Sequence, residues 1–229
     1  RWVINAVNEA TGEPEQYRAK FMMACAGYYN YDQGYRPDFP GEKNFKGLIV
    51  HPQHWPENLD YTGKKVVVIG SGATAVTLIP SMANKVEHIT MLQRSPSYIF
   101  SLPSVDALTR VLQKTLPSKL AYKLNRTRTI GLAHFMFKAS KSKPEVVRRF
   151  LIAMMRRQLK GSSVDIKHFT PNYMPWDQRL CLVPDGDFFK ALRSGKASVA
   201  TDTIKQFVPN GIELNSGEVL EADIIVTAT

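Results

Sequence analysis

A short glycine-rich turn is the segment of this sequence best suited to chemistry. Its pattern is G-x-G-x-x-A, and its residues are Gly70, Ser71, Gly72, Ala73, Thr74 and Ala75. It directly follows an apolar run and opens a helical pattern over about 73–84. The first glycine permits a tight turn, the second lets the backbone approach a pyrophosphate, and the small alanine lets helix and strand pack closely. The helix N-terminus adds free N–H groups, so the turn indicates a dinucleotide site; a plain structural turn is the alternative.

The next apolar run, at 88–93, indicates which dinucleotide is bound. Sites that prefer NAD place Asp or Glu about 20 residues past the glycines, to bond the ribose 2′-hydroxyl. Here the run ends in Gln93-Arg94-Ser95, without an acid. Arg94 offers a charged donor fork for a 2′-phosphate and Ser95 adds a hydroxyl, which favours NADPH. The alternative is a surface arginine beside a loop.

The elements that must position these residues follow from periodicity and turn residues. We expect strands at 2–7 and 17–25, joined by a turn around 11–14, and we interpret residues 28–63 as a linker. The strand that begins at Lys64, the helix after the glycine turn and the strand at 88–93 make the first half of a βαβ unit. The fold class is therefore α/β.

The second half of the sequence contains a helical insertion and then returns to α/β. Residues 103–160 predict three helices, which begin near Pro103, Pro117 and Pro144. After the insertion we expect a helix near 187–193, a strand at 197–200 and further short strands to the end of the sequence.

Composition excludes several classes of protein. Hydrophobic residues make up 44% and charged residues 22%, which is ordinary for a globular protein. The sequence lacks an apolar run of the roughly 18 residues that a membrane-spanning helix needs. It shows no secretory signal, and its two cysteines are far apart and outside any metal-ligand spacing. We expect a cytoplasmic protein with no metal site.

The net charge of +10 is concentrated in the helical insertion. Residues 103–160 hold 14 Lys or Arg against two acids. The stretch 148–157 alternates basic and apolar residues at helical spacing, which suits contact with an anionic membrane surface. A helix with one packed and one solvated face is the plainer alternative. We expect no nucleic-acid binding, since the sequence shows no recognition motif.

A second motif lies upstream of the glycine turn, at Phe45-Lys46-Gly47-Leu48-Ile49-Val50-His51-Pro52-Gln53-His54-Trp55-Pro56. It resembles the Baeyer–Villiger monooxygenase signature F-x-G-x-x-x-H-x-x-x-W-[P/D] at every fixed position. The sister flavin monooxygenases that oxidise amines and sulfides carry an aromatic and a basic residue in place of Trp55-Pro56. The segments HPQHWPE, GSGATAVTL, LQRSP and WDQRLCLVPDGDFF look most like a subgroup that activates thioamide prodrugs.

This resemblance implies an enzyme that uses FAD and NADPH to insert one oxygen atom of O2 into ketones, giving esters, and that also oxidises sulfides or thioamides. It implies two candidate catalytic positions: Arg179 holds negative charge near the flavin, and His51 couples movement of the two nucleotide domains. Trp55 is expected to be a packed ring that borders the cofactor. Many family members carry Lys where this sequence has Gln178, so the uncharged Gln178 leaves NADPH preference more dependent on Arg94.

The resemblance also implies the domain organisation. Residues 1–63 correspond to partial FAD-domain strands and a linker, and residues 64–229 to a Rossmann-like NADPH-binding domain with the helical insertion. The family's FAD-binding glycine motif is absent before Lys64, and both ends read as cuts through a larger fold. We therefore expect this chain alone to bind FAD poorly and to lack turnover. A non-catalytic NADP(H)-binding fragment and a sister sulfide or amine monooxygenase are the alternatives.

Overall fold

The computed structural model describes residues 1–27, 30–178 and 180–228, and its contacts divide the chain into two compact units. These units are Arg1–Gly34 and Tyr35–Thr229. The predicted domain division at 63/64 stays a prediction.

The first unit contains one antiparallel hairpin. It consists of β1 (Trp2–Val7) and β2 (Pro14–Ala19), with Trp2 opposite Ala19. The turn closes where the Asn8 N–H donates to the Glu13 carbonyl over 2.9 Å. Because the second strand pairs from Pro14 onward, the predicted strand at 17–25 is wrong in both bounds.

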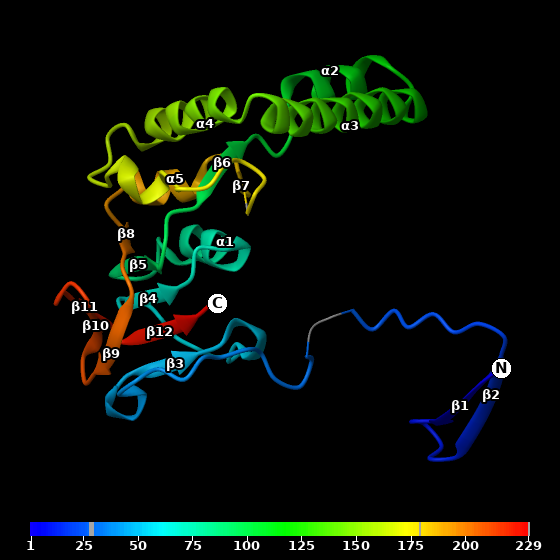
Figure 1. The fold of residues 1–229 in the computed structure, drawn as a ribbon, viewed down its shortest axis with the longest axis horizontal. Coiled ribbons are helices and arrows are strands. Elements are labelled where there is room, and N and C mark those ends of the chain that lie inside the picture. The colour runs from blue at the N-terminus through cyan, green and yellow to red at the C-terminus, as the bar shows by residue number, and fades with distance from the viewer. Residues whose placement is uncertain (28–29, 179, 229) are drawn as a thin grey trace. The chain divides into compact units, whose positions relative to one another are not determined.

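The second unit is built on a five-stranded parallel sheet, visible in the lower left of Figure 1. The order across the sheet is β3-β12-β4-β5-β8. The strands are β3 (Leu48–Val50), β12 (Ile224–Thr227), β4 (Lys65–Ile69), β5 (His88–Gln93) and β8 (Ala197–Thr201). β3 lies within the segment that the sequence predicted to be a linker, so that prediction is wrong for these three residues. The parallel order confirms the α/β fold class.

Both faces of this sheet are covered, and β4 shows how. Val66 and Val68 join one hydrophobic cluster, while Val67 and Ile69 join another. Side chains alternate between the faces of a strand, so a continuous apolar run fits a strand buried on both sides. The cluster of Val66 and Val68 includes buried side chains of the helices α1 (Ala73–Met82) and α5 (Asp187–Arg193).

An antiparallel meander covers the other face. Its strands are β9 (Ile204–Val208), β10 (Gly211–Leu214) and β11 (Val219–Glu221). Phe207, Ile212 and Leu214 from the meander pack in the same cluster as Val67 and Ile69. Three short 3-10 helices complete the connections: η1 (Glu42–Asn44), η2 (Pro52–His54) and η3 (Ile166–Phe169).

The helical insertion has the three predicted helices. They are α2 (Ala107–Thr115), α3 (Ser118–Ser142) and α4 (Pro144–Leu159). Pro117 and Pro144 stand at the starts of α3 and α4, as predicted, whereas α2 begins after Asp106, whose carboxylate accepts from the Thr109 N–H over 2.7 Å. The sequence missed a pair of parallel strands that flanks the insertion, β6 (Tyr98–Leu102) and β7 (Leu180–Pro184).

The basic helix α4 is packed along one face. Val147, Leu151, Met155 and Leu159 repeat every four residues and are buried in the main cluster. Arg149 and Arg157 are exposed. The stretch at 148–157 therefore belongs to a helix with one packed and one solvated face, which was the plainer interpretation of its pattern.

Candidate functional site

Three of the predicted site residues directly follow the last residue of a parallel strand. His51 follows β3, Gly70 follows β4 and Arg94 follows β5. Val226 of β12 pairs with Val50 on one side and with Val68 on the other. Ile69 in turn pairs with Leu92. Because parallel strands end at one edge of a sheet, this register brings the three residues to the same carboxyl edge, where α/β proteins bind ligands.

The glycine turn has the local geometry that the motif predicts. Gly70 has a φ of 129°, a backbone conformation that side chains disfavour, and its N–H donates to the Leu92 carbonyl over 2.8 Å. Helix α1 begins at Ala73, and its N-cap Gly72 makes no side-chain capping bond. The first-turn N–H groups, of Ala73 to Ala75, have no acceptor within the helix and leave its positive end available to an anion.

Contacts around the turn fix its shape. Ala75 is buried, which allows the close helix–sheet packing expected of the third motif position, while Ala73 and Thr74 are exposed. The Ser71 and Ser97 hydroxyl oxygens lie 2.9 Å apart. The sequence did not single out Ser97, although a second serine so soon after Ser95 is the signal that could have found it.

Arg94 and Ser95 are exposed directly after β5. Within the described ranges, Arg94 forms no ion pair, so its guanidinium is available to a ligand. The acid that follows β8 at the same edge is Asp202. Its carboxylate accepts from the N–H groups of Thr203 and Ser216, and the Ser216 and Thr203 hydrogen bonds lower the pKa of Asp202.

A buried polar network, absent from the sequence prediction, fastens η3 to this edge. Gln93 is 1% exposed, and its Nε2 donates to the His168 carbonyl over 2.7 Å and to the Thr201 hydroxyl over 2.8 Å. His168 Nδ1 lies 2.7 Å from the same hydroxyl. Burial, with Lys167 nearby, lowers the pKa of His168. No sequence signal could have paired His168 with Gln93, since 75 positions separate them.

His51 and Trp55 are both half-buried. His51 Nδ1 accepts from the Gln53 N–H over 3.2 Å and so caps η2. Trp55 packs against the main hydrophobic cluster, with its ring centroid 6.4 Å from that of Tyr61. The expectation that Trp55 is a packed ring is confirmed, whereas its place beside a cofactor and the coupling role of His51 stay predictions.

Arg179 lies outside the described residues, and the neighbouring segment is held against α3. Gln178 is exposed. The Asp177 carboxylate accepts from Lys141 Nζ over 2.9 Å, and the Trp176 and Phe137 ring centroids are 6.0 Å apart. The structure thus ties the segment just before Arg179 to the helical insertion, and the roles of Gln178 and Arg179 stay predictions.

A cavity of about 740 Å³ lies at the opposite, amino-terminal edge of the sheet. Its lining includes Lys46, Lys64 and Asp223 and contains none of the predicted site residues. Three of the predicted site residues lie instead at the carboxyl edge, where α/β proteins bind ligands. Among the described residues, no cluster of three His, Cys, Asp or Glu side chains could hold a metal ion. No helix in the described ranges is both long and apolar enough to cross a bilayer.

Comparison with known proteins identifies the family of this chain. Residues 2–143 match the family model described as flavin-binding monooxygenase-like. The chain is 56% identical, over its whole length and 46% of the relative's, to the probable FAD-binding monooxygenase AlmA of Acinetobacter baylyi. It is 55% identical, over the same shares, to the FAD-containing monooxygenase EthA of Mycolicibacterium smegmatis.

A solved structure has the same fold. Cyclohexanone monooxygenase from Rhodococcus sp. Phi1, bound to NADP+, superposes with a TM-score of 0.66 at 21% identity, over 99% of this chain and 49% of that one. The chain therefore spans about half the length of the relatives and structures that it matches.

Proposed function

Because this chain belongs to the flavin-binding monooxygenase-like family, we propose that it is the NADPH-binding portion of an FAD-dependent Baeyer–Villiger monooxygenase. The observation that carries the proposal is the convergence of His51, Gly70 and Arg94 at one edge of the parallel sheet. The glycine turn belongs to dinucleotide sites in general, and His51 belongs to the Baeyer–Villiger signature. Their common edge supports the proposal that both motifs contribute to one site.

The residues present fit NADPH. The uncapped start of α1 and the glycine turn would hold the pyrophosphate, with Ser71 beside Ser97 shaping the turn. Arg94, exposed and without an ion pair in the described part of the chain, would bind the 2′-phosphate together with Ser95, and the neutral Gln178 would add a hydrogen bond. The bound cofactors would supply hydride transfer and oxygen chemistry, while the protein positions them.

FAD would be held mainly by parts of the protein outside this sequence, because the one G-x-G turn here is the NADPH turn. Arg179 would provide fixed positive charge beside the flavin, where an oxygen-transfer reaction builds up negative charge. His51 would link the sheet to the FAD-binding portion, since it caps η2 directly after β3. Trp55 would support this connection through its packed ring.

The substrate class we propose is an apolar ketone, converted to an ester with one oxygen atom of O2, with sulfides or thioamides as further substrates. The Trp55-Pro56 pair favours ketone oxidation over the sister sulfide and amine oxidation. We place the protein in the cytoplasm, in keeping with its cysteine usage.

The test uses the full-length FAD-loaded protein with NADPH and O2, on an aryl methyl ketone and on a thioether. The expected result is ester from the ketone, lost in Arg179→Ala while NADPH is still consumed. Arg149→Ala, which removes an exposed arginine of α4, is the matched control and should retain ester formation. Sulfoxide without ester would favour a sister monooxygenase, and NADPH binding without any oxidation would favour a binding module.

A further inference from the structure

The hairpin of α2 and α3 leaves most of its apolar side chains outside the core. The two helices lie side by side at the top of Figure 1. No residue of α2 is buried, and on the 25-residue α3 only Ala121 and Ser140 are. Large apolar side chains of the hairpin are instead exposed, by 65% for Phe135 and 61% for Leu132, and also at Leu108, Leu120, Leu124 and Ile130. Clusters of exposed apolar side chains usually mark an interaction surface.

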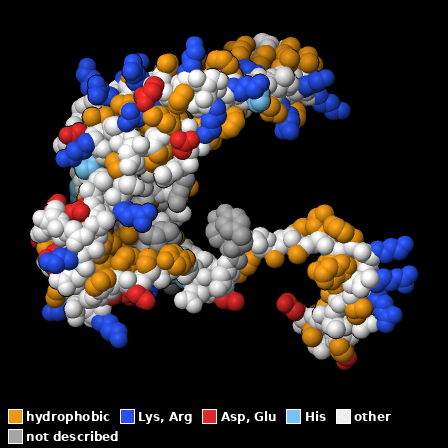
Figure 2. Space-filling view, viewed as in Figure 1, with side chains coloured by type: hydrophobic (Ala, Val, Ile, Leu, Met, Phe, Trp, Pro, Cys, Tyr) orange, Lys and Arg blue, Asp and Glu red, His pale blue; other side chains and the backbone are white. Residues whose placement is uncertain are grey.

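The same hairpin has a uniform positive charge. Residues 107–143 contain nine Lys or Arg and no Asp or Glu. In the described part of the chain only two of these cations have an ion-pair partner, Arg128 with Asp106 and Lys141 with Asp177. Figure 2 shows Lys and Arg side chains around the apolar ones over this part of the molecule. The surface is therefore apolar and cationic at once.

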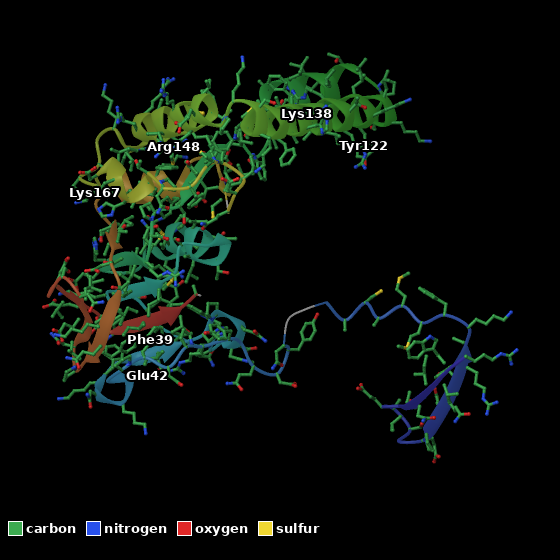
Figure 3. All side chains as sticks on the ribbon, in the orientation of Figure 1. Phe39, Glu42, Tyr122, Lys138, Arg148 and Lys167 are labelled. Carbon is green, nitrogen blue, oxygen red and sulfur yellow. The ribbon has the colours of Figure 1, made fainter. Side chains whose placement is uncertain are left out.

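The two kinds of side chain alternate along α3 at helical spacing. Lys119, Lys123 and Arg126 follow each other on one face, and Leu120 and Leu124 lie beside them, one residue further along. Tyr122 and Lys138, marked in Figure 3, are exposed on the same helix. Helices that lie in the membrane interface combine apolar side chains at the headgroup boundary with lysines and arginines on the lipid phosphates.

We propose that the surface formed by α2 and α3 lies on an anionic lipid bilayer. Charge complementarity selects this occupant, because a bilayer rich in anionic lipid supplies both negative charge and an apolar layer. A second copy of the chain would bring nine further cations against the first nine. The packed helix α4 is a weaker membrane contact, since its apolar stripe of Val147, Leu151 and Met155 is buried. Its exposed large apolar side chains are Val146 and Phe150, fewer than those of the hairpin.

The test measures co-sedimentation of the full-length FAD-loaded protein with vesicles. One set is phosphatidylcholine alone, and in the other about a third of the lipid is phosphatidylglycerol. We expect binding to the anionic vesicles only, weakened by added salt. Replacing Lys119 and Lys123 together by Gln should reduce binding roughly tenfold to thirtyfold, because each cation contributes about a factor of five. Replacing Leu132 and Phe135 together by Ser should reduce it roughly tenfold.

The matched control removes two equally exposed cations from α4, as Arg156→Gln with Arg157→Gln, and should bind vesicles nearly as well as the wild type. An equal loss in this control would overturn the assignment to α2 and α3. Absence of vesicle binding, with the hairpin covered by another part of the full-length protein or by a second copy, would overturn the proposal as well. NADPH oxidation with a water-soluble ketone is measured in parallel, so that failure of the lipid proposal is distinguished from failure of the proposed enzyme.

Discussion

The Thr227 hydroxyl donates a hydrogen bond to the Val50 carbonyl over 3.3 Å, between strands β12 and β3. Thr227 is fully buried, and Val50 immediately precedes His51. This bond fastens the short edge strand β3 at the point where the Baeyer–Villiger signature reaches the carboxyl edge of the sheet. The strand is only three residues long, so few other bonds hold it.

Thr227→Val should therefore lower the free energy of unfolding by about 1 kcal/mol, the usual net value of one hydrogen bond. Urea unfolding of the full-length protein measures this loss. Thr77→Val is the matched control, because the Thr77 hydroxyl bonds the Ala73 carbonyl at an exposed position of α1. It should change stability by less than about 0.5 kcal/mol. Equal losses of stability in the two variants would contradict the claim that the buried Thr227 hydrogen bond stabilises β3.

The two glycines of the turn should respond differently to replacement by alanine. Gly70 has a φ of 129°, so Gly70→Ala should strain the backbone and lower stability by about 1–3 kcal/mol. Gly72 has a φ of −81°, which any residue adopts. Gly72→Ala should keep most of the stability and weaken NADPH binding at least about tenfold, because a Cβ would stand where the pyrophosphate approaches. Unfolding curves and NADPH titrations separate the two effects, and wild-type affinity in Gly72→Ala would argue against the site.

The buried network at the ends of β5 and β8 should make stability depend on pH. Burial lowers the pKa of His168, while Lys167 lowers it further and Asp165 opposes the shift. The unfolded chain then binds a proton more readily than the folded chain, so stability is complete above the unfolded pKa near 6.5 and is lost as the pH falls below it. Between pH 7 and pH 5 the wild type should lose more thermal stability than His168→Gln. The same loss in both proteins would show that His168 does not cause it.

The sequence predicted the core of the fold where signals were local. The apolar run of β4, the glycine turn and the helical period of α1 are contiguous, and each element appears where expected. β3 was missed because it has three residues in a segment rich in turn formers and pairs with β12, which is 176 positions away. β6 and β7 were missed for the same reason, since Tyr98 pairs with Leu180 across the whole insertion.

The sequence likewise predicted the residues of the candidate site but not the contacts that support them. Residue types at fixed spacing identified Gly70, Arg94 and His51, and the parallel register then placed them at one edge. The packing that supports them depends on contacts between distant segments, as in the bond from Gln93 to His168. The sequence also could not predict that the apolar side chains of α2 and α3 are exposed. A periodic apolar pattern is the same in a helix that packs against the core and in a helix that does not.

Dissociation constants of the full-length FAD-loaded protein for NADPH and NADH test the central claim most directly. Arg94→Gln should weaken NADPH binding about tenfold to a hundredfold, the value of a charge-assisted hydrogen bond, and leave NADH binding unchanged. Lys64→Gln, an exposed cation beside the cavity at the opposite edge, should change neither constant. If Arg94→Gln left NADPH binding intact, or if Lys64→Gln weakened it instead, the NADPH 2′-phosphate would not bind at the carboxyl edge of the sheet.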